Sequence, residues 1–240
     1  MNDKRRYWVI LIIIGVAILL IASLTTANWY HNQKTIKEQT SAERMPDSLS
    51  VESNRNLDNV SAEDNVNRFL AKQREIMKEL LQTLKKMERT GNGSLDYLME
   101  MISLNESAAT ISESYLSHGG SDRQFTAISK NIISGHEDEI AKINGLINQY
   151  RLDEHKDEDK ESAYLEDFTG LLSKYEKMDK PASDSLEHAY AAAIISHHQM
   201  AVDMARSILE YTDYSEIKSM AQNTINTREQ LISDLKKLAP

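Results

Sequence analysis

The stretch that decides the fold is Ile194 to Ala205, which reads I-I-S-H-H-Q-M-A-V-D-M-A. It contains no Gly or Pro, and its apolar residues recur at spacings of three and four, which indicates an α-helix. One apolar seam extends from this stretch in both directions and comprises Tyr190, Ile194, His197, Ala201, Met204, Ile208 and Tyr211. A histidine therefore lies on a seam that we expect to face neighbouring helices.

Two methionines accompany this histidine. Met200 lies three residues after His197 and four before Met204, so one imidazole and two thioethers share one side of about two turns. These are ligands that soft metal ions such as Cu(I) prefer. Adjacent residues of a helix diverge by about 100°, so His197 and His198 cannot both point straight into the core, and we expect His198 to be exposed unless it binds metal. His136, on another apolar seam, is a candidate to approach His197 from a neighbouring helix.

The composition favours an all-α protein of the cell envelope over a nucleic-acid-binding protein. The 240 residues include few Gly, three Pro and no Cys. The formal net charge is -9; residues 1–6 carry +2, so the remainder carries -11, which would attract cations and repel nucleic acid. The absence of Cys excludes disulfides, thiolate metal sites and cysteine nucleophiles. No phosphate-binding loop, nucleophile elbow or HExxH motif occurs, so we do not expect an enzyme.

The N-terminal segment has the pattern of a membrane anchor. Trp8 to Leu24 is almost wholly apolar, follows the basic cluster Lys4-Arg5-Arg6, and lies between the aromatic pairs Tyr7-Trp8 and Trp29-Tyr30. Aromatic pairs one bilayer thickness apart are typical of the two membrane interfaces. We therefore predict a single-pass anchor over residues 1–30, with the N-terminus in the cytoplasm and the rest of the chain extracytoplasmic.

A cleaved signal peptide is the alternative, because Thr25-Thr26-Ala27 offers small residues at which a peptidase could cut. Both interpretations place the remaining chain outside the cytoplasm. Residues 31–60 are polar and without a sustained period, which predicts a flexible linker.

Residues 61–240 are predicted to form one helical domain. The charged stretch Asp153 to Glu161 is predicted to be a solvated loop. Helices are predicted over about 61–89, 94–117, 121–152, 162–178, 183–210 and 215–238. Their short connections favour antiparallel neighbours.

A three-helix unit occurs twice in this domain. The fifth helix aligns with the second at an offset of 93 residues, which places Tyr190 on Tyr97 and Ala201 on Ala108. The fourth helix aligns with the first at an offset of 91, and the sixth with the third at 92. The simplest architecture is a bundle of two pseudo-symmetric halves.

The repeat also contains an internal control for the histidine motif. Where the second copy has His197, His198, Met200 and Met204, the first has Leu104, Asn105, Ser107 and Ile111. Apolar residues thus satisfy the fold at two of these positions, so packing alone does not require His197 and Met204. This difference favours a function for the second copy.

Ile195 to Ala205 resembles the signature of the domain of unknown function 305 family, a helix that reads roughly M-I-x-H-H-x-x-A-I-x-M-A. The family's next helix reads roughly A-x-x-I-I-x-x-Q-x-x-E-I-x-x-M; here Arg228 stands at the Gln position and Leu231 at the Glu position, while His136 stands at the Gln position of the first copy. The resemblance covers about residues 62–240. It implies a secreted or membrane-anchored, ferritin-like helical bundle, often duplicated, of which some members bind copper through His and Met and serve in copper tolerance.

Carried over by position, the resemblance implies copper ligands at His197, His198, Met200 and Met204, to which we add His136. The missing histidine pair of the first copy limits the expectation to one site. We therefore expect a membrane-anchored, extracytoplasmic copper-binding protein for metal sequestration or tolerance. The alternative is a structural or partner-binding bundle of the cell envelope that binds no metal. In that case His197 is a core histidine bonded to a tyrosine or carboxylate, and the methionines fill the core.

Overall fold

The computed structural model describes residues 51–151, 158–177 and 183–239, and only the backbone of residues 51–61. Six α-helices and no strands are found in these ranges, which confirms the all-α class. The helices are α2 (Val51–Lys86), α3 (Gly93–Ser117), α4 (Arg123–Tyr150), α5 (Glu158–Glu176), α6 (Leu186–Tyr211) and α7 (Ser215–Leu238).

The N-terminal boundary of the helical domain differs from the prediction. α2 begins at Val51, so residues 51–60 are helical where the sequence predicted the end of a linker. This decapeptide contains neither Gly nor Pro, so nothing in it interrupts the helix. The helix continues through Ser61-Ala62-Glu63-Asp64, a capping motif that is typical of a helix start and from which the start at residue 61 was predicted. The predicted anchor and residues 31–50 lie outside the described residues. Among the described helices, none has the length and apolar character needed to cross a bilayer.

Two helix starts also differ from the prediction. α5 begins at Glu158, inside the predicted solvated loop, and its first turn is rich in acidic residues that suit the positive end of the helix dipole. α3 begins at Gly93, one residue before the predicted start, because the side chain of Asn92 caps it by accepting a hydrogen bond of 3.0 Å from the Ser94 backbone N–H.

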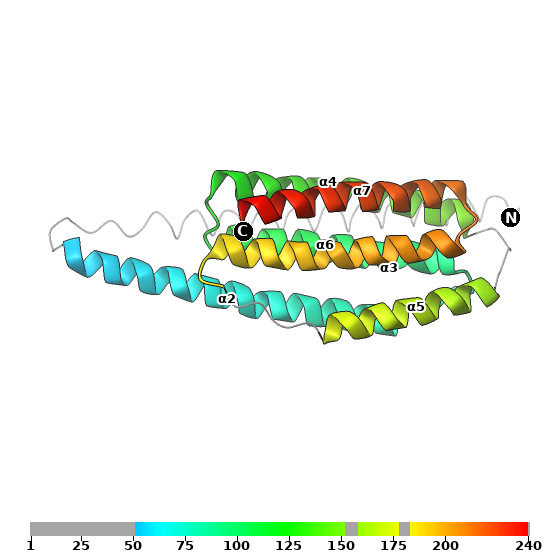
Figure 1. Cartoon of the computed structure of the whole chain (residues 1–240), viewed down its shortest axis with the longest axis horizontal. Coiled ribbons are helices and arrows are strands. Elements are labelled where there is room, and N and C mark those ends of the chain that lie inside the picture. Colours follow the sequence, from blue (N-terminus) through cyan, green and yellow to red (C-terminus); the bar gives the residue numbers. More distant parts are fainter. Residues whose placement is uncertain (1–50, 152–157, 178–182, 240) are drawn as a thin grey trace, which may run out of the picture. The chain divides into compact units, whose positions relative to one another are not determined.

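The helices of the compact unit formed by residues 54–240 lie in three layers (Figure 1). α2 and α5 form one outer layer, α4 and α7 form the other, and α3 and α6 lie between them. α3 packs against α4 and α6 against α7 as hairpins, and α3 also packs against α6. Each layer therefore contains one helix from each copy of the repeat.

Contacts between equivalent residues agree with pseudo-two-fold symmetry. Lys85 pairs with Glu176, 91 residues later, which is the offset that aligns α5 with α2. Arg228 donates a hydrogen bond to His136, 92 residues earlier, which is the offset that aligns α7 with α4. In a two-fold arrangement, residues that contact their own counterparts lie at the axis. The axis thus passes close to His136 and Arg228.

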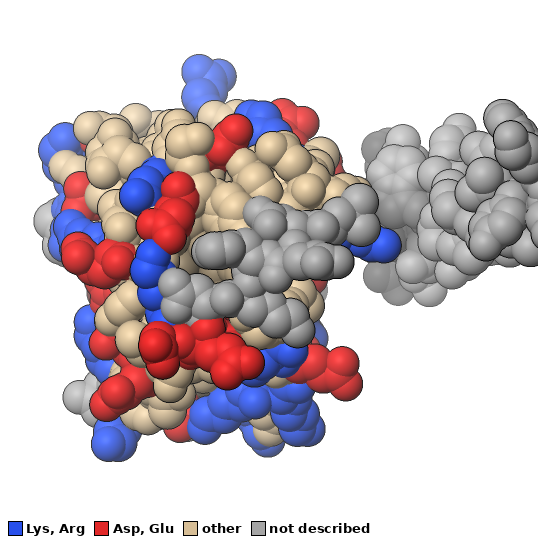
Figure 2. Space-filling model, turned by 90° about the vertical axis from the view of Figure 1, so that its right-hand side faces the viewer, with Lys and Arg blue, Asp and Glu red and all other residues tan. Residues whose placement is uncertain are grey.

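The interior is mostly apolar, whereas charged groups of both signs cover the surface. At the end of the unit seen in Figure 2, acidic and basic side chains are interspersed around uncharged residues. Exposed ion pairs such as Lys160 with Asp213 contribute little to stability. Burial of the apolar seams of α3 and α6 supplies most of the stability. The polar residues that are buried in these seams are therefore informative.

Candidate metal centre

Both histidines of the α6 motif are buried. His197 is 1% exposed and His198 is 0% exposed. The prediction that His198 would be exposed without metal is therefore wrong. α6 packs against α3, α5 and α7, so it is enclosed over most of its circumference, and residues that diverge by 100° both remain inside.

The tautomer of His197 is fixed by α3. Its Nε2 lies 2.5 Å from the hydroxyl oxygen of Ser107, and that hydroxyl lies 3.0 Å from the carbonyl oxygen of Leu104. The carbonyl can only accept, so the hydroxyl donates to it and accepts the Nε2–H of the imidazole. His197 Nδ1 then carries a lone pair, and it has no hydrogen-bond partner among the described residues.

This imidazole stays neutral at physiological pH. Burial, together with the nearby His136 and Arg228, lowers the pKa of His197 to about 3. A neutral imidazole whose N–H is held by an acceptor is the form in which histidine binds metal ions. The geometry therefore supplies one candidate ligand atom, His197 Nδ1, inside the bundle.

The two methionines of the motif are core residues. Met200 and Met204 are fully buried and belong to the apolar cluster that also contains Leu81, Leu98 and Leu104. Helical spacing keeps both thioethers on the side of α6 that carries His197. This placement is compatible with metal binding and equally with core filling.

His136 approaches His198 rather than His197. The ring centroids of His136 and His198 are 5.6 Å apart, and a guanidinium group contacts both rings. Arg228 Nη1 lies 2.6 Å from His136 Nε2 and 3.4 Å from His198 Nε2. Nη2 of the same residue contacts Asn105 Oδ1 at 3.1 Å and forms an ion pair with Glu139.

Because a guanidinium only donates, the Nε2 atoms that it contacts must be acceptors. Arg228 Nη1 also lies 3.2 Å from His136 Nδ1, but that nitrogen lies 3.4 Å from a carboxylate oxygen of Glu139, which can accept its proton. His136 and His198 are therefore neutral, with the proton on Nδ1, and burial lowers the pKa of each. Burial alone would raise the pKa of Glu139, but its contacts with His136 and Arg228 lower it, so it remains ionised. The cluster thus combines one cation, one anion and two neutral imidazoles.

The three predicted histidine ligands do not share one donor site. The Nε2 atoms of His136 and His198 accept hydrogen bonds from Arg228, whereas the Nε2 of His197 is held by Ser107. The Nδ1 atoms of His197 and His198 have no hydrogen-bond partner among the described residues, and of these two only His197 Nδ1 carries a lone pair. Within the described ranges, no three His, Asp or Glu side chains lie close enough to share a metal ion. The assignment of these residues as copper ligands stays a prediction.

Several residues of the cluster were given no role by the sequence. Ser107 and Asn105 were seen only as first-copy replacements of the motif, and Arg228 only as a seam residue of the last helix that departs from the family pattern. The sequence contained a signal for the contact between His136 and Arg228, because these residues occupy equivalent positions of the repeat at an offset of 92. Polar residues at equivalent seam positions of a duplicated bundle are expected to meet at its axis.

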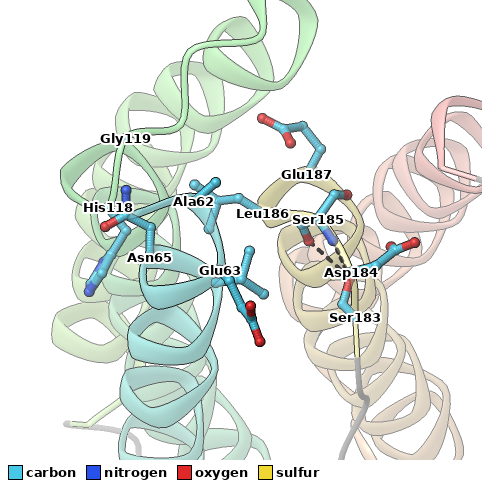
Figure 3. A pocket seen from close by; sticks show the side chains of 11 residues that line it. Ala62, Glu63, Asn65, His118, Gly119, Ser183, Asp184, Ser185, Leu186 and Glu187 are labelled. Carbon is cyan, nitrogen blue, oxygen red and sulfur yellow. Dashed lines mark hydrogen bonds between the residues drawn. The ribbon is translucent and has the colours of Figure 1, made fainter. Parts of the chain in front are cut away.

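A separate surface pocket of about 590 Å³ is lined by the N-terminal end of α6, by α2 and by the α3–α4 turn (Figure 3). Its acidic residues are Glu63, Asp184 and Glu187, whose carboxylates point in different directions. From Leu186 to His197 the helix rises by about 16 Å, so this pocket is not part of the histidine cluster.

The fold and the cluster define an all-α helical bundle with a buried polar centre. The chain belongs to the family described as Domain of unknown function (DUF305), whose model matches residues 94–239. It is also similar to two solved structures of CopM, in an Ag-bound form obtained by soaking and in a Cu(I)-bound form. Each is 18% identical to it, with alignments that cover 60% of this chain and 93% and 94% of CopM, at TM-scores of 0.41 and 0.44. No curated protein matches the sequence.

Proposed function

We propose that this protein binds a soft metal ion, Cu(I), in the interior of its second copy and serves in copper sequestration or delivery. The observation that carries the proposal is the buried, unprotonated and unpartnered Nδ1 of His197. A buried polar atom without a partner is unfavourable, and a bound ion would satisfy it.

The ligand chemistry supports Cu(I) over harder ions. Beside His197 the motif offers the thioethers of Met200 and Met204, which bind soft ions and have little affinity for Mg²⁺ or Ca²⁺. The Ser107 hydroxyl would orient the imidazole from its other nitrogen, as acceptors commonly do for metal-bound histidines. The proposed role is storage or transfer of the ion, without catalysis.

We further propose that residues 1–30 anchor the protein in the membrane and that the bundle lies on the extracytoplasmic side. The apolar segment, its aromatic flanks and the preceding basic cluster support this topology. An acidic body outside the membrane would attract metal cations from its surroundings.

Anaerobic titration of the full chain with Cu(I), in competition with a chromophoric Cu(I) chelator, tests the proposal. We expect one Cu(I) per chain, and we expect His197→Leu to abolish binding and Met204→Ile to weaken it at least tenfold. Both variants introduce the residue of the first copy at the equivalent position, so packing is retained. Met101→Ile, which exchanges a buried first-copy methionine for its second-copy counterpart, should leave binding unchanged.

The alternative is a structural or partner-binding bundle without metal. The contacts of Arg228 favour this alternative for two of the five predicted ligands, His136 and His198. There the guanidinium already occupies the Nε2 lone pairs of His136 and His198. If the wild-type chain takes up no Cu(I), or if His197→Leu binds it as tightly as the wild type, this alternative is supported and the copper proposal fails.

A further inference from the structure

Arg228 occupies a position at which acceptor atoms from three helices converge. Its guanidinium contacts His136 Nε2, His198 Nε2, Asn105 Oδ1 and a carboxylate oxygen of Glu139. All four are atoms that bind cations. Two imidazoles and one carboxylate are also a set that holds Zn²⁺ in proteins.

The position is deeply enclosed and lies at the junction of the two copies. Arg228 is 4% exposed, and its partners come from α3, α4 and α6, while it projects from α7. Asn105 and His198 are themselves equivalent residues of the two copies, at an offset of 93. The acceptors therefore surround the pseudo-two-fold axis, where both copies contribute to one small volume.

We infer that Arg228 is a built-in cation that fills this four-acceptor site and thereby excludes divalent metal ions from the centre of the bundle. A guanidinium stays protonated at any physiological pH, so the site is never open to a second cation. Its charge would also repel a metal ion placed among the same acceptors. Arg228 is in this sense a specificity-determining residue, because it occupies the lone pairs of His136 and His198 and leaves the lone pair of His197 Nδ1 available to a metal ion.

The inference explains why the imidazoles and the carboxylate do not already form a metal site. A guanidinium keeps its acceptors about 3 Å from two different nitrogen atoms, whereas a metal ion needs its ligands about 2 Å from a single point, so the guanidinium holds the acceptors apart. Removal of its side chain would leave the acceptors facing a shared space, with Glu139 only partly exposed and without its ion-pair partner. A divalent cation would then restore the lost charge balance.

Titration of the full chain with Co²⁺, followed by visible absorption, tests the inference. We expect no ligand-field bands from the wild type and stoichiometric uptake of Co²⁺ with such bands by Arg228→Ala. Arg228→Lys keeps the positive charge and should remain without bands. The double variants of Arg228→Ala with His136→Ala or with Glu139→Gln should lose the gained site.

Arg228→Gln provides a second route if the alanine variant is not folded, because an amide can still hydrogen bond to His136 while the charge is removed. Circular dichroism of each variant, with and without Zn²⁺, should show metal-dependent stabilisation only where the charge has been removed. Absence of Co²⁺ binding by both folded neutral variants, or equal binding by Arg228→Lys, would overturn the inference. Failure of Cu(I) binding by the wild type would refute the proposed function and leave this result untouched.

Discussion

The two copies of the three-helix unit share a packing seam and differ in where they bury polar groups. Tyr97 and Tyr190 occupy equivalent seam positions and are both fully buried. At the middle of the seam the first copy has Leu104, and the second has His197. The scaffold thus tolerates hydrocarbon at this position, and the histidine of the second copy is an addition to it.

Four residues earlier the difference is reversed, because there the first copy has a polar residue and the second copy an apolar one. In the first copy Glu100 is fully buried, accepts a hydrogen bond from Tyr164 and pairs with Arg89 at 2.5 Å. In the second copy the equivalent residue is Ala193, and the counterpart of Tyr164 is Gln73, whose Oε1 is buried without a partner. Each half therefore has a buried polar residue at a position where the other half is apolar.

The largest effect expected from this comparison concerns acid stability. The folded pKa of His197 is about 3, below its ordinary value of 6.5, so the unfolded chain takes up a proton that the folded chain refuses. Stability is therefore intact above pH 6.5 and falls as the pH drops toward 3, by up to about 4 kcal/mol from this residue.

Urea unfolding between pH 6.5 and pH 4.5 measures this loss. His197→Leu should make the profile less steep, with the remaining slope due to the buried His136 and His198. His188→Ala, at an exposed position of the same helix, should leave the profile as steep as in the wild type. Equal slopes for the wild type and His197→Leu would contradict the buried neutral imidazole.

A smaller effect of opposite sign is expected from the first copy. Burial raises the pKa of Glu100 to about 7, although Tyr164 and Arg89 lower it. The folded state therefore holds a proton that the unfolded state has released, and stability falls as the pH rises from 4.5 through 7, by about 3 kcal/mol at most. Glu100→Gln should remove this dependence; if unfolding of the variant still weakens equally over that range, another group is responsible.

The smallest effect is expected at Gln73. Its unpartnered Oε1 lines a groove next to Ala193, so replacement by an apolar side chain removes a buried unsatisfied acceptor. Gln73→Leu should raise the free energy of unfolding by about 1 kcal/mol. The control Gln82→Leu, on the exposed side of the same groove, should change it by less than about 0.5 kcal/mol. Destabilisation by the first variant would show that the amide has a role.

Much of the fold could be predicted from the sequence because helical period and repeat are local or self-similar properties. The bounds of α7 were predicted at both ends, and the offsets of the repeat reappear as contacts at the axis. The start of α2 was missed because a capping motif inside a helix reads like one at its end.

The candidate site was predicted less well, since its chemistry depends on which residues meet between helices. His197 was identified from its seam, but nothing near it in the sequence shows that Ser107 fixes its tautomer. His198 was expected to be exposed because a single helix face was considered, whereas α6 is enclosed on several sides. Arg228 was expected on a seam, and its contact with both imidazoles depends on the pairing of the two copies.

The most direct test of the account is the protonation state of the two adjacent histidines, read from the imidazole nitrogen signals of the full chain by ¹⁵N NMR at neutral pH. We predict opposite tautomers: the proton on Nε2 and a pyridine-like Nδ1 for His197, and the proton on Nδ1 for His198. Addition of Cu(I) should shift the Nδ1 signal of His197 and leave His198 unchanged. A protonated Nδ1 at His197, with or without Cu(I), would contradict the account.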